Sequence, residues 1–107
     1  MKQSIRDWLA QQFGEDEALC TELYSQYSAD MAAGVKALQE FAETGDIASM
    51  VPKAHALKGI ALMIGDEETA ELCLMLERVC KQGDKAALAS TLKSLADEVS
   101  SLGGGGI

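Results

Sequence analysis

The dipeptide Gly-Asp punctuates the chain three times, as Gly45-Asp46, Gly65-Asp66 and Gly83-Asp84. In each pair the glycine can adopt the left-handed conformation that ends a helix, and the aspartate can cap the N-terminus of the next helix. Almost no loop is then left between the two helices. Because connections this tight force successive helices to run antiparallel, we expect an all-α protein built as an antiparallel up-down four-helix bundle.

Apolar residues recur at three- and four-residue spacing in every segment that these dipeptides define, as in amphipathic helices. We expect long helices over residues 17–44, after Asp46, over 67–82 and over 85–102. A short extra N-terminal helix is expected over residues 5–13, with Ser4 as N-cap and Asp7 in the capping-box position. Its apolar side suits a lid over one end of the bundle. The expected core residues of the last two helices are Leu72, Leu76, Val79, Leu88, Leu92, Leu95, Val99 and Leu102.

The only proline, Pro52, lies six residues after Asp46. A proline inside a helix removes one backbone hydrogen bond and clashes with the preceding turn. The helix therefore either starts late, with Ser49 as its cap, or runs continuously from Ile47 with a kink near Pro52. We favour the continuous helix, because Asp46 is already a good N-cap.

The chain of 107 residues is long enough for one domain with a single modest core. Glycine disfavours helices, so we expect the domain to cover residues 1–102 and a flexible Gly-rich tail to cover 103–107, either a native end or a linker remnant. A net charge of −8 argues against nucleic acid as a partner. No apolar run is long enough to span a bilayer and no signal-peptide core is present, so we expect a cytoplasmic protein that does not contact membranes.

Three cysteines, Cys20, Cys73 and Cys80, are an odd number without metal-binding spacing. On a helix the rise alone separates Cys73 from Cys80 by about 10 Å, which is too far for a disulfide. We expect free thiols, most of them buried.

His55 is the only histidine, and it falls off the apolar stripe of its helix. Lys58 lies at i+3, close enough to share a ligand with the imidazole, and Gly59 lies at i+4. Glycine inside a helix costs about 0.5–1 kcal/mol relative to alanine, so its place next to the histidine suggests that the ring is kept accessible. From these residues alone, Lys58 is better interpreted as an ordinary solvated lysine.

The motif Ala54-His55-x-Leu57-Lys58-Gly59, then Gly65 and Leu72-Cys73-x-x-Leu76-Glu77, resembles the histidine-phosphotransfer (HPt) domain of two-component phosphorelays. The resemblance implies a phosphoryl carrier in which His55 accepts a phosphoryl group from one receiver-domain aspartate and passes it to another. Lys58 would stabilise the phosphate charge, and Gly59 would give access to His55. The implied partners are response-regulator receiver domains and a hybrid sensor histidine kinase, with any Mg²⁺ supplied by the receiver and no cofactor held by this monomeric chain.

Three apolar residues near the histidine, Val51, Ile60 and Leu62, either cover the neighbouring helix or form a docking patch for a partner. In the family, small or polar residues usually follow the glycine. Ile60 departs from this pattern, and this difference affects which receivers can dock. No nucleotide-binding loop is present, so we expect no ATP site and no enzymatic activity of the chain's own. The alternative function is a helical interaction module that binds receiver or kinase domains without transfer.

Overall fold

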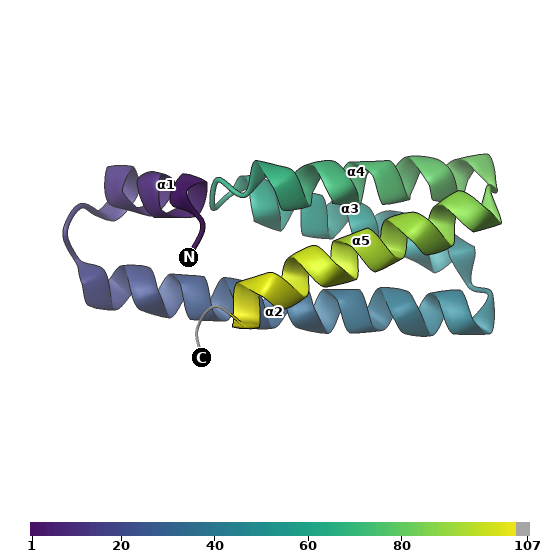
Figure 1. Ribbon diagram of the computed structural model, residues 1–107, viewed down its shortest axis with the longest axis horizontal. Coiled ribbons are helices and arrows are strands. Elements are labelled where there is room, and N and C mark those ends of the chain that lie inside the picture. Colours follow the sequence, from purple (N-terminus) through teal and green to yellow (C-terminus); the bar gives the residue numbers. More distant parts are fainter. Residues whose placement is uncertain (105–107) are drawn as a thin grey trace.

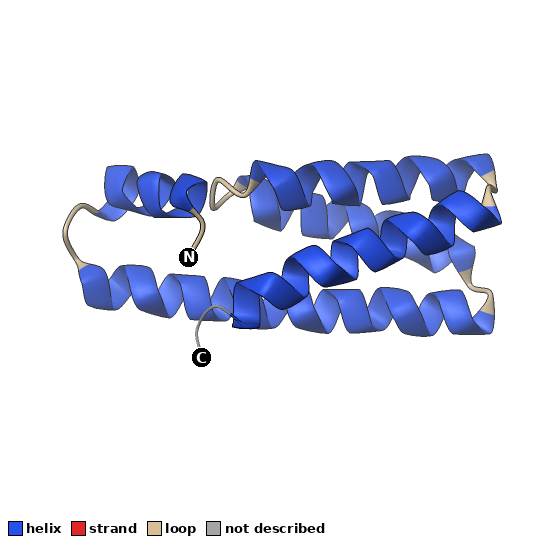
Figure 2. Ribbon diagram, viewed as in Figure 1, coloured by secondary structure: helices blue, strands red, loops and turns tan. Residues whose placement is uncertain are grey.

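The computed structural model describes residues 1–104, in which five helices follow one another without a strand (Figure 1, Figure 2). The all-α class predicted from the sequence is therefore confirmed for this part of the chain. The helices are α1 (Gln3–Phe13), α2 (Glu17–Thr44), α3 (Ile47–Leu62), α4 (Glu67–Gln82) and α5 (Lys85–Gly104).

The four longer helices contact one another in a ring, in which α2 packs on α3, α3 on α4, α4 on α5 and α5 on α2. The resulting rod measures 45 × 23 × 18 Å. Helix α1 folds back along the first part of α2 and lies in line with α4, beyond the connection between α3 and α4 (Figure 1). Along the ring, Gly34 of α2 lets Leu57 of α3 come so close that an added Cβ would collide with a Leu57 methyl group.

Two of the three Gly-Asp connections form as the sequence predicts. Gly45 and Gly83 are left-handed, with φ of 76° and 74°, and end α2 and α4. Asp46 accepts a hydrogen bond from the backbone N–H of Ser49 at 3.2 Å. At the third connection Gly65 is also left-handed, with φ of 78°, and Asp66 caps α4 as predicted, but α3 already ends at Leu62 and a three-residue turn precedes Asp66.

Helix α3 is continuous from Ile47, with Asp46 as N-cap and Pro52 inside it. The continuous helix that we favoured is therefore confirmed, and the late start at Ser49 is wrong. The side chain of Ser49 instead donates to Asp46 at 2.7 Å, in the first turn of the helix.

The start of α1 differs from the prediction. The helix begins at Gln3 with Lys2 as N-cap and no capping side chain, so Ser4 is not the cap. Asp7 accepts a hydrogen bond from the Gln3 amide at 2.7 Å instead of completing a capping box. The Lys2 carbonyl accepts the first helical hydrogen bond, from the N–H of Arg6 at 2.9 Å, and the Lys2 ammonium is held by Asp66 at 2.7 Å.

The end of α5 also differs, because the helix continues through Gly103 and Gly104. Leu102 just before them is buried, and its carbonyl oxygen accepts a hydrogen bond from the Tyr24 hydroxyl at 2.9 Å. This anchor holds the last turn in place despite the low helix propensity of glycine. Two residues of the expected tail are thus helical, and the remainder, 105–107, lies outside the described residues.

The core is mainly apolar, with Asp66 and Thr69 as completely buried polar residues, and on α4 the buried residues differ in part from those expected. Cys73, Leu76 and Cys80 are buried, whereas Leu72 and Val79 are only half-buried. Burial raises the pKa of the Cys73 thiol to about 12, so this thiol stays protonated at neutral pH. All three cysteines are free, as predicted. No helix within residues 1–104 is long and apolar enough to cross a membrane.

Candidate functional site

His55 projects from the solvent-facing side of α3, and 65% of its side chain is exposed. The preceding residue, Ala54, and Leu57 two residues on are buried in the core. This confirms that the histidine lies off the apolar stripe. The imidazole is therefore accessible to another molecule and does not serve as packing.

Glu77 of α4 reaches the histidine from the neighbouring helix. Its Oε2 lies 3.4 Å from Nδ1 of His55, and its Oε1 lies 3.4 Å from the ammonium of Lys81, one turn further along α4. Only 11% of the Glu77 side chain is exposed. Burial alone would raise the pKa of this carboxyl, but the hydrogen bonds from His55 and Lys81 outweigh burial and hold it below the usual value.

The placement of Glu77 selects a role for each imidazole nitrogen. An ionised carboxylate can only accept hydrogen bonds, so Nδ1 facing it carries the proton. In the neutral ring the lone pair is then on Nε2, which is left for an electrophile. If Nε2 forms a bond, the positive charge that develops on the ring is compensated by the neighbouring carboxylate.

The structure places Lys58 and Gly59 on the same part of α3 as His55. Lys58 is half-buried and makes no ion pair with any of residues 1–104. A Cβ added at Gly59 would meet no atom within 4 Å, apart from the backbone of its own helix. The glycine is thus not required for packing among the described residues.

The three residues of the expected docking patch do not form one surface. Val51 is half-buried, whereas Ile60 and Leu62 are 37% and 52% exposed. Leu62 lines a hollow between α3 and α4 together with Lys58, and Ile60 lines a groove under α1. Sequence reasoning missed Met63, which is 72% exposed beyond Leu62.

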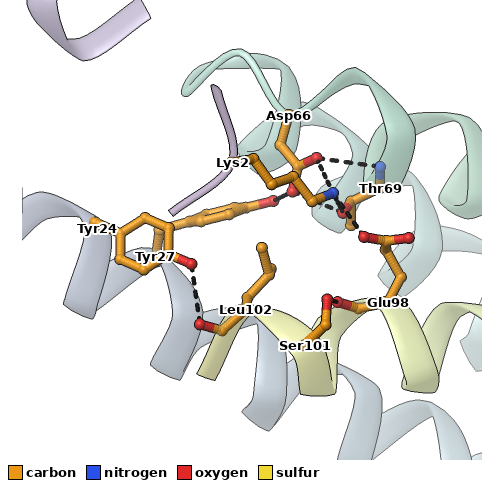
Figure 3. A network of polar contacts seen from close by, with 8 residues as sticks. All are labelled: Lys2, Tyr24, Tyr27, Asp66, Thr69, Glu98, Ser101 and Leu102. Atoms are coloured by element: carbon orange, nitrogen blue, oxygen red, sulfur yellow. Dashed lines mark hydrogen bonds and ion pairs between the residues drawn. The ribbon is translucent and has the colours of Figure 1, made fainter. Parts of the chain in front are cut away.

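A second polar centre lies at the α3–α4 connection, where Asp66 is completely buried (Figure 3). Its carboxylate accepts hydrogen bonds from the Lys2 ammonium and the Tyr27 hydroxyl, both at 2.7 Å, and from the hydroxyl and backbone N–H of Thr69 at 2.6 and 3.3 Å. Lys2 also pairs with Glu98 of α5 at 2.8 Å. This centre joins α1, α2, α4 and α5, and the sequence showed only its capping role.

The comparisons with known proteins agree with this geometry. The model of one family, the Hpt domain, matches residues 22–105. The chain therefore belongs to the Hpt family, whose members have a phosphotransfer role in phosphorelays and interact there with receiver domains and kinases. No curated protein and no solved structure gives a match.

Proposed function

We propose that this protein is a phosphorelay carrier that accepts a phosphoryl group on Nε2 of His55 from a receiver-domain aspartate and passes it to a second receiver. The observation that carries the proposal is the exposed imidazole whose Nδ1 faces a buried, ionised Glu77. An antiparallel up-down four-helix bundle with an extra N-terminal helix is the scaffold that holds the ring, and the carrier acts as a cytoplasmic monomer.

In the transfer step, Nε2 attacks the phosphorus of the aspartyl phosphate as the P–O bond to the aspartate breaks. The N–P bond forms, and the free carboxylate leaves with the bonding electrons. Such transfers proceed through a loose transition state and need mainly positioning and charge stabilisation. Glu77 orients the ring and offsets its positive charge, and Lys58 is free to approach the equatorial phosphate oxygens.

The same step in reverse delivers the phosphoryl group to the next receiver. The aspartate of that receiver attacks phosphorus, and the neutral imidazole leaves with its proton on Nδ1. Mg²⁺ in the receiver's acidic pocket supplies further charge stabilisation, so the carrier itself needs no cofactor and no ATP site. Gly59 keeps the approach to Nε2 open for both partners.

The decisive experiment incubates the chain with an autophosphorylated kinase–receiver pair and follows acid-labile, base-stable phosphate on this protein. We expect His55→Gln to abolish uptake while helicity and melting temperature stay close to those of the parent, because the side chain is exposed. A variant that still accepts phosphate would refute the assignment of His55. An interaction module without transfer would instead bind the receiver while the parent chain stays unlabelled.

A further inference from the structure

The carboxylate of Glu77 is held at both of its oxygens, by partners on two different helices. Oε2 lies 3.4 Å from Nδ1 of His55 on α3, and Oε1 lies 3.4 Å from the ammonium of Lys81 on α4. Only 11% of the Glu77 side chain is exposed, compared with 62% of Lys81. Glu77 therefore links an exposed ammonium on its own helix to the imidazole on the neighbouring helix.

The tautomer of the imidazole decides whether His55 can react. A neutral imidazole free in water carries its proton more often on Nε2, which leaves the lone pair on Nδ1. In this site a lone pair on Nδ1 would face the Glu77 carboxylate and could not attack an electrophile. The hydrogen bond from Nδ1–H to Glu77 must therefore reverse the intrinsic preference, and it does so only while the carboxylate points at the ring.

A second contact is needed to keep the carboxylate in this direction, because a glutamate side chain has several rotatable bonds. Lys81 supplies it from the next turn of α4, at i+4. A glutamate followed by a lysine at this spacing is the favourable order for an ion pair on a helix. The pair holds Oε1, so that Oε2 of the same planar group is left for the ring.

Lys58 is a second cation near this carboxylate. It follows His55 by one turn of α3 and makes no ion pair within the described part of the chain. Burial is the largest influence on the pKa of Cys73 and raises it, whereas the charge of Lys58 acts in the opposite direction, so this lysine lies near Cys73. Cys73 precedes Glu77 by one turn of α4. A carboxylate released by Lys81 would therefore have Lys58 in its vicinity.

We propose that Lys81 is a positioning residue for phosphoryl transfer, which holds the Glu77 carboxylate against Nδ1 of His55 and so keeps the lone pair on Nε2. By occupying Glu77, it also leaves Lys58 unpaired for the phosphate oxygens. The inference rests on the proposed carrier function, because it says how the same imidazole is kept reactive. The hydrogen bond of Lys81 goes to Glu77, so its effect on the imidazole passes through that carboxylate.

The first measurement is the tautomer of His55, which needs no phosphate donor. Because the chain has one histidine, the imidazole nitrogen signals in an NMR spectrum report on this site alone. At about pH 9 the ring is neutral while lysine keeps its charge, since their ordinary pKa values are about 6.5 and 10.4. We expect the proton mainly on Nδ1 in the parent and a shift of the population toward Nε2–H in Lys81→Met. Lys81→Arg keeps the charge and should restore the parent tautomer.

The second measurement is the rate of phosphorylation with two donors. Phosphoramidate is small enough to reach His55 without docking, whereas a receiver domain phosphorylated with acetyl phosphate must dock. Lys81→Met should slow uptake from both donors about 2- to 5-fold, the range that an exposed ion pair can contribute. The KM for the receiver and the melting temperature should stay close to those of the parent.

Lys93→Met is the matched control, because it removes another i,i+4 lysine–carboxylate pair, at 3.0 Å on α5, and changes the net charge equally. It should match the parent in tautomer and in both rates. A double-mutant cycle then shows whether the effect passes through Glu77. In a Glu77→Ala background, Lys81→Met should cause no further loss of rate. If Glu77→Ala does not fold, the comparison of Lys81→Met with Lys81→Arg remains decisive.

Three outcomes overturn the proposal. The first is a parent-like tautomer in Lys81→Met. The second is a loss of rate with the receiver but not with phosphoramidate, which would make Lys81 a docking residue. The third is an undiminished effect of Lys81→Met in the Glu77→Ala background. If the parent chain is labelled by neither donor, the carrier function itself fails and the proposal with it. That result is distinct from the other three, because in those the parent is labelled.

Discussion

Replacing Asp66 by alanine tests whether the buried polar centre is a network or only a helix cap. The carboxylate is completely buried and accepts four hydrogen bonds. Loss of the N-cap of α4 costs about 1 kcal/mol. The Tyr27 hydroxyl loses its acceptor inside the protein, which adds about 1–3 kcal/mol. Lys2 keeps Glu98 as a partner.

The free energy of unfolding should therefore fall by about 2–4 kcal/mol, which lowers the melting temperature of a domain this size by roughly 10–30 °C. The assay is thermal and urea unfolding followed by circular dichroism at neutral pH. Asp84→Ala is the matched control, because Asp84 caps α5 through the N–H of Ala87 at 3.0 Å without further partners. We expect this control to lose only about 1 kcal/mol. Equal losses for the two variants would refute the reasoning.

The pH dependence gives an independent check on the charge of Asp66. Burial, the largest single influence, would raise the pKa of this carboxyl, but hydrogen bonds from Lys2, Thr69 and Tyr27 outweigh it and hold the pKa below the ordinary value of 3.8. A lowered pKa means that the ionised group stabilises the fold fully above pH 3.8, and that this contribution is lost as the pH falls through the folded value. The difference in stability between the parent and Asp66→Asn should therefore shrink below pH 3.8.

Four further substitutions, at three positions, test α3 and its contact with α2. Gly34→Ala should lower the free energy of unfolding by about 1–3 kcal/mol, because its Cβ would collide with Leu57; a chemical melt that matches the parent would contradict the close approach of α2 and α3. Gly59→Ala should raise the free energy of unfolding by about 0.5–1 kcal/mol, since nothing lies near the new methyl group. Gly59→Glu should fold normally but receive phosphate poorly. Rapid transfer to the glutamate variant would show that the glycine does not provide access to His55. Lys58→Ala should slow transfer to His55 without abolishing it, because the charge is lost but the nucleophile remains; a single-turnover rate equal to that of the parent would leave Lys58 as an ordinary solvated residue.

Local signals in the sequence predicted most of the fold. Gly45 and Gly83 end helices, and Asp46 and Asp84 cap the next ones, because each role depends on hydrogen bonds between residues a few positions apart. The exposed position of His55 also followed from helical periodicity. These features need no knowledge of the rest of the chain.

The features that the sequence did not reveal depend on contacts between distant segments. The Lys2 ammonium at the start of α1 contacts Asp66, which is 64 residues away. Glu77 approaches His55 across 22 residues, and nothing in the helical pattern of α4 distinguishes an inward-facing glutamate from a solvated one. Leu72 was expected in the core but is only half-buried, because periodicity alone does not decide which of two adjacent apolar residues faces inward.

The narrow shape of the molecule affects the order in which partner proteins can bind to it. The shorter dimensions of the molecule are 23 and 18 Å, and a typical protein interface is about 32 Å across, so one partner covers the full width of the flank on which His55 stands. In the proposed carrier function, donor and acceptor receivers would therefore compete for the same nitrogen and would have to bind one after the other. A donor that stays bound after transfer would block the acceptor, so dissociation of the dephosphorylated donor would limit the overall rate of transfer. Tighter binding of receivers would then lower this rate.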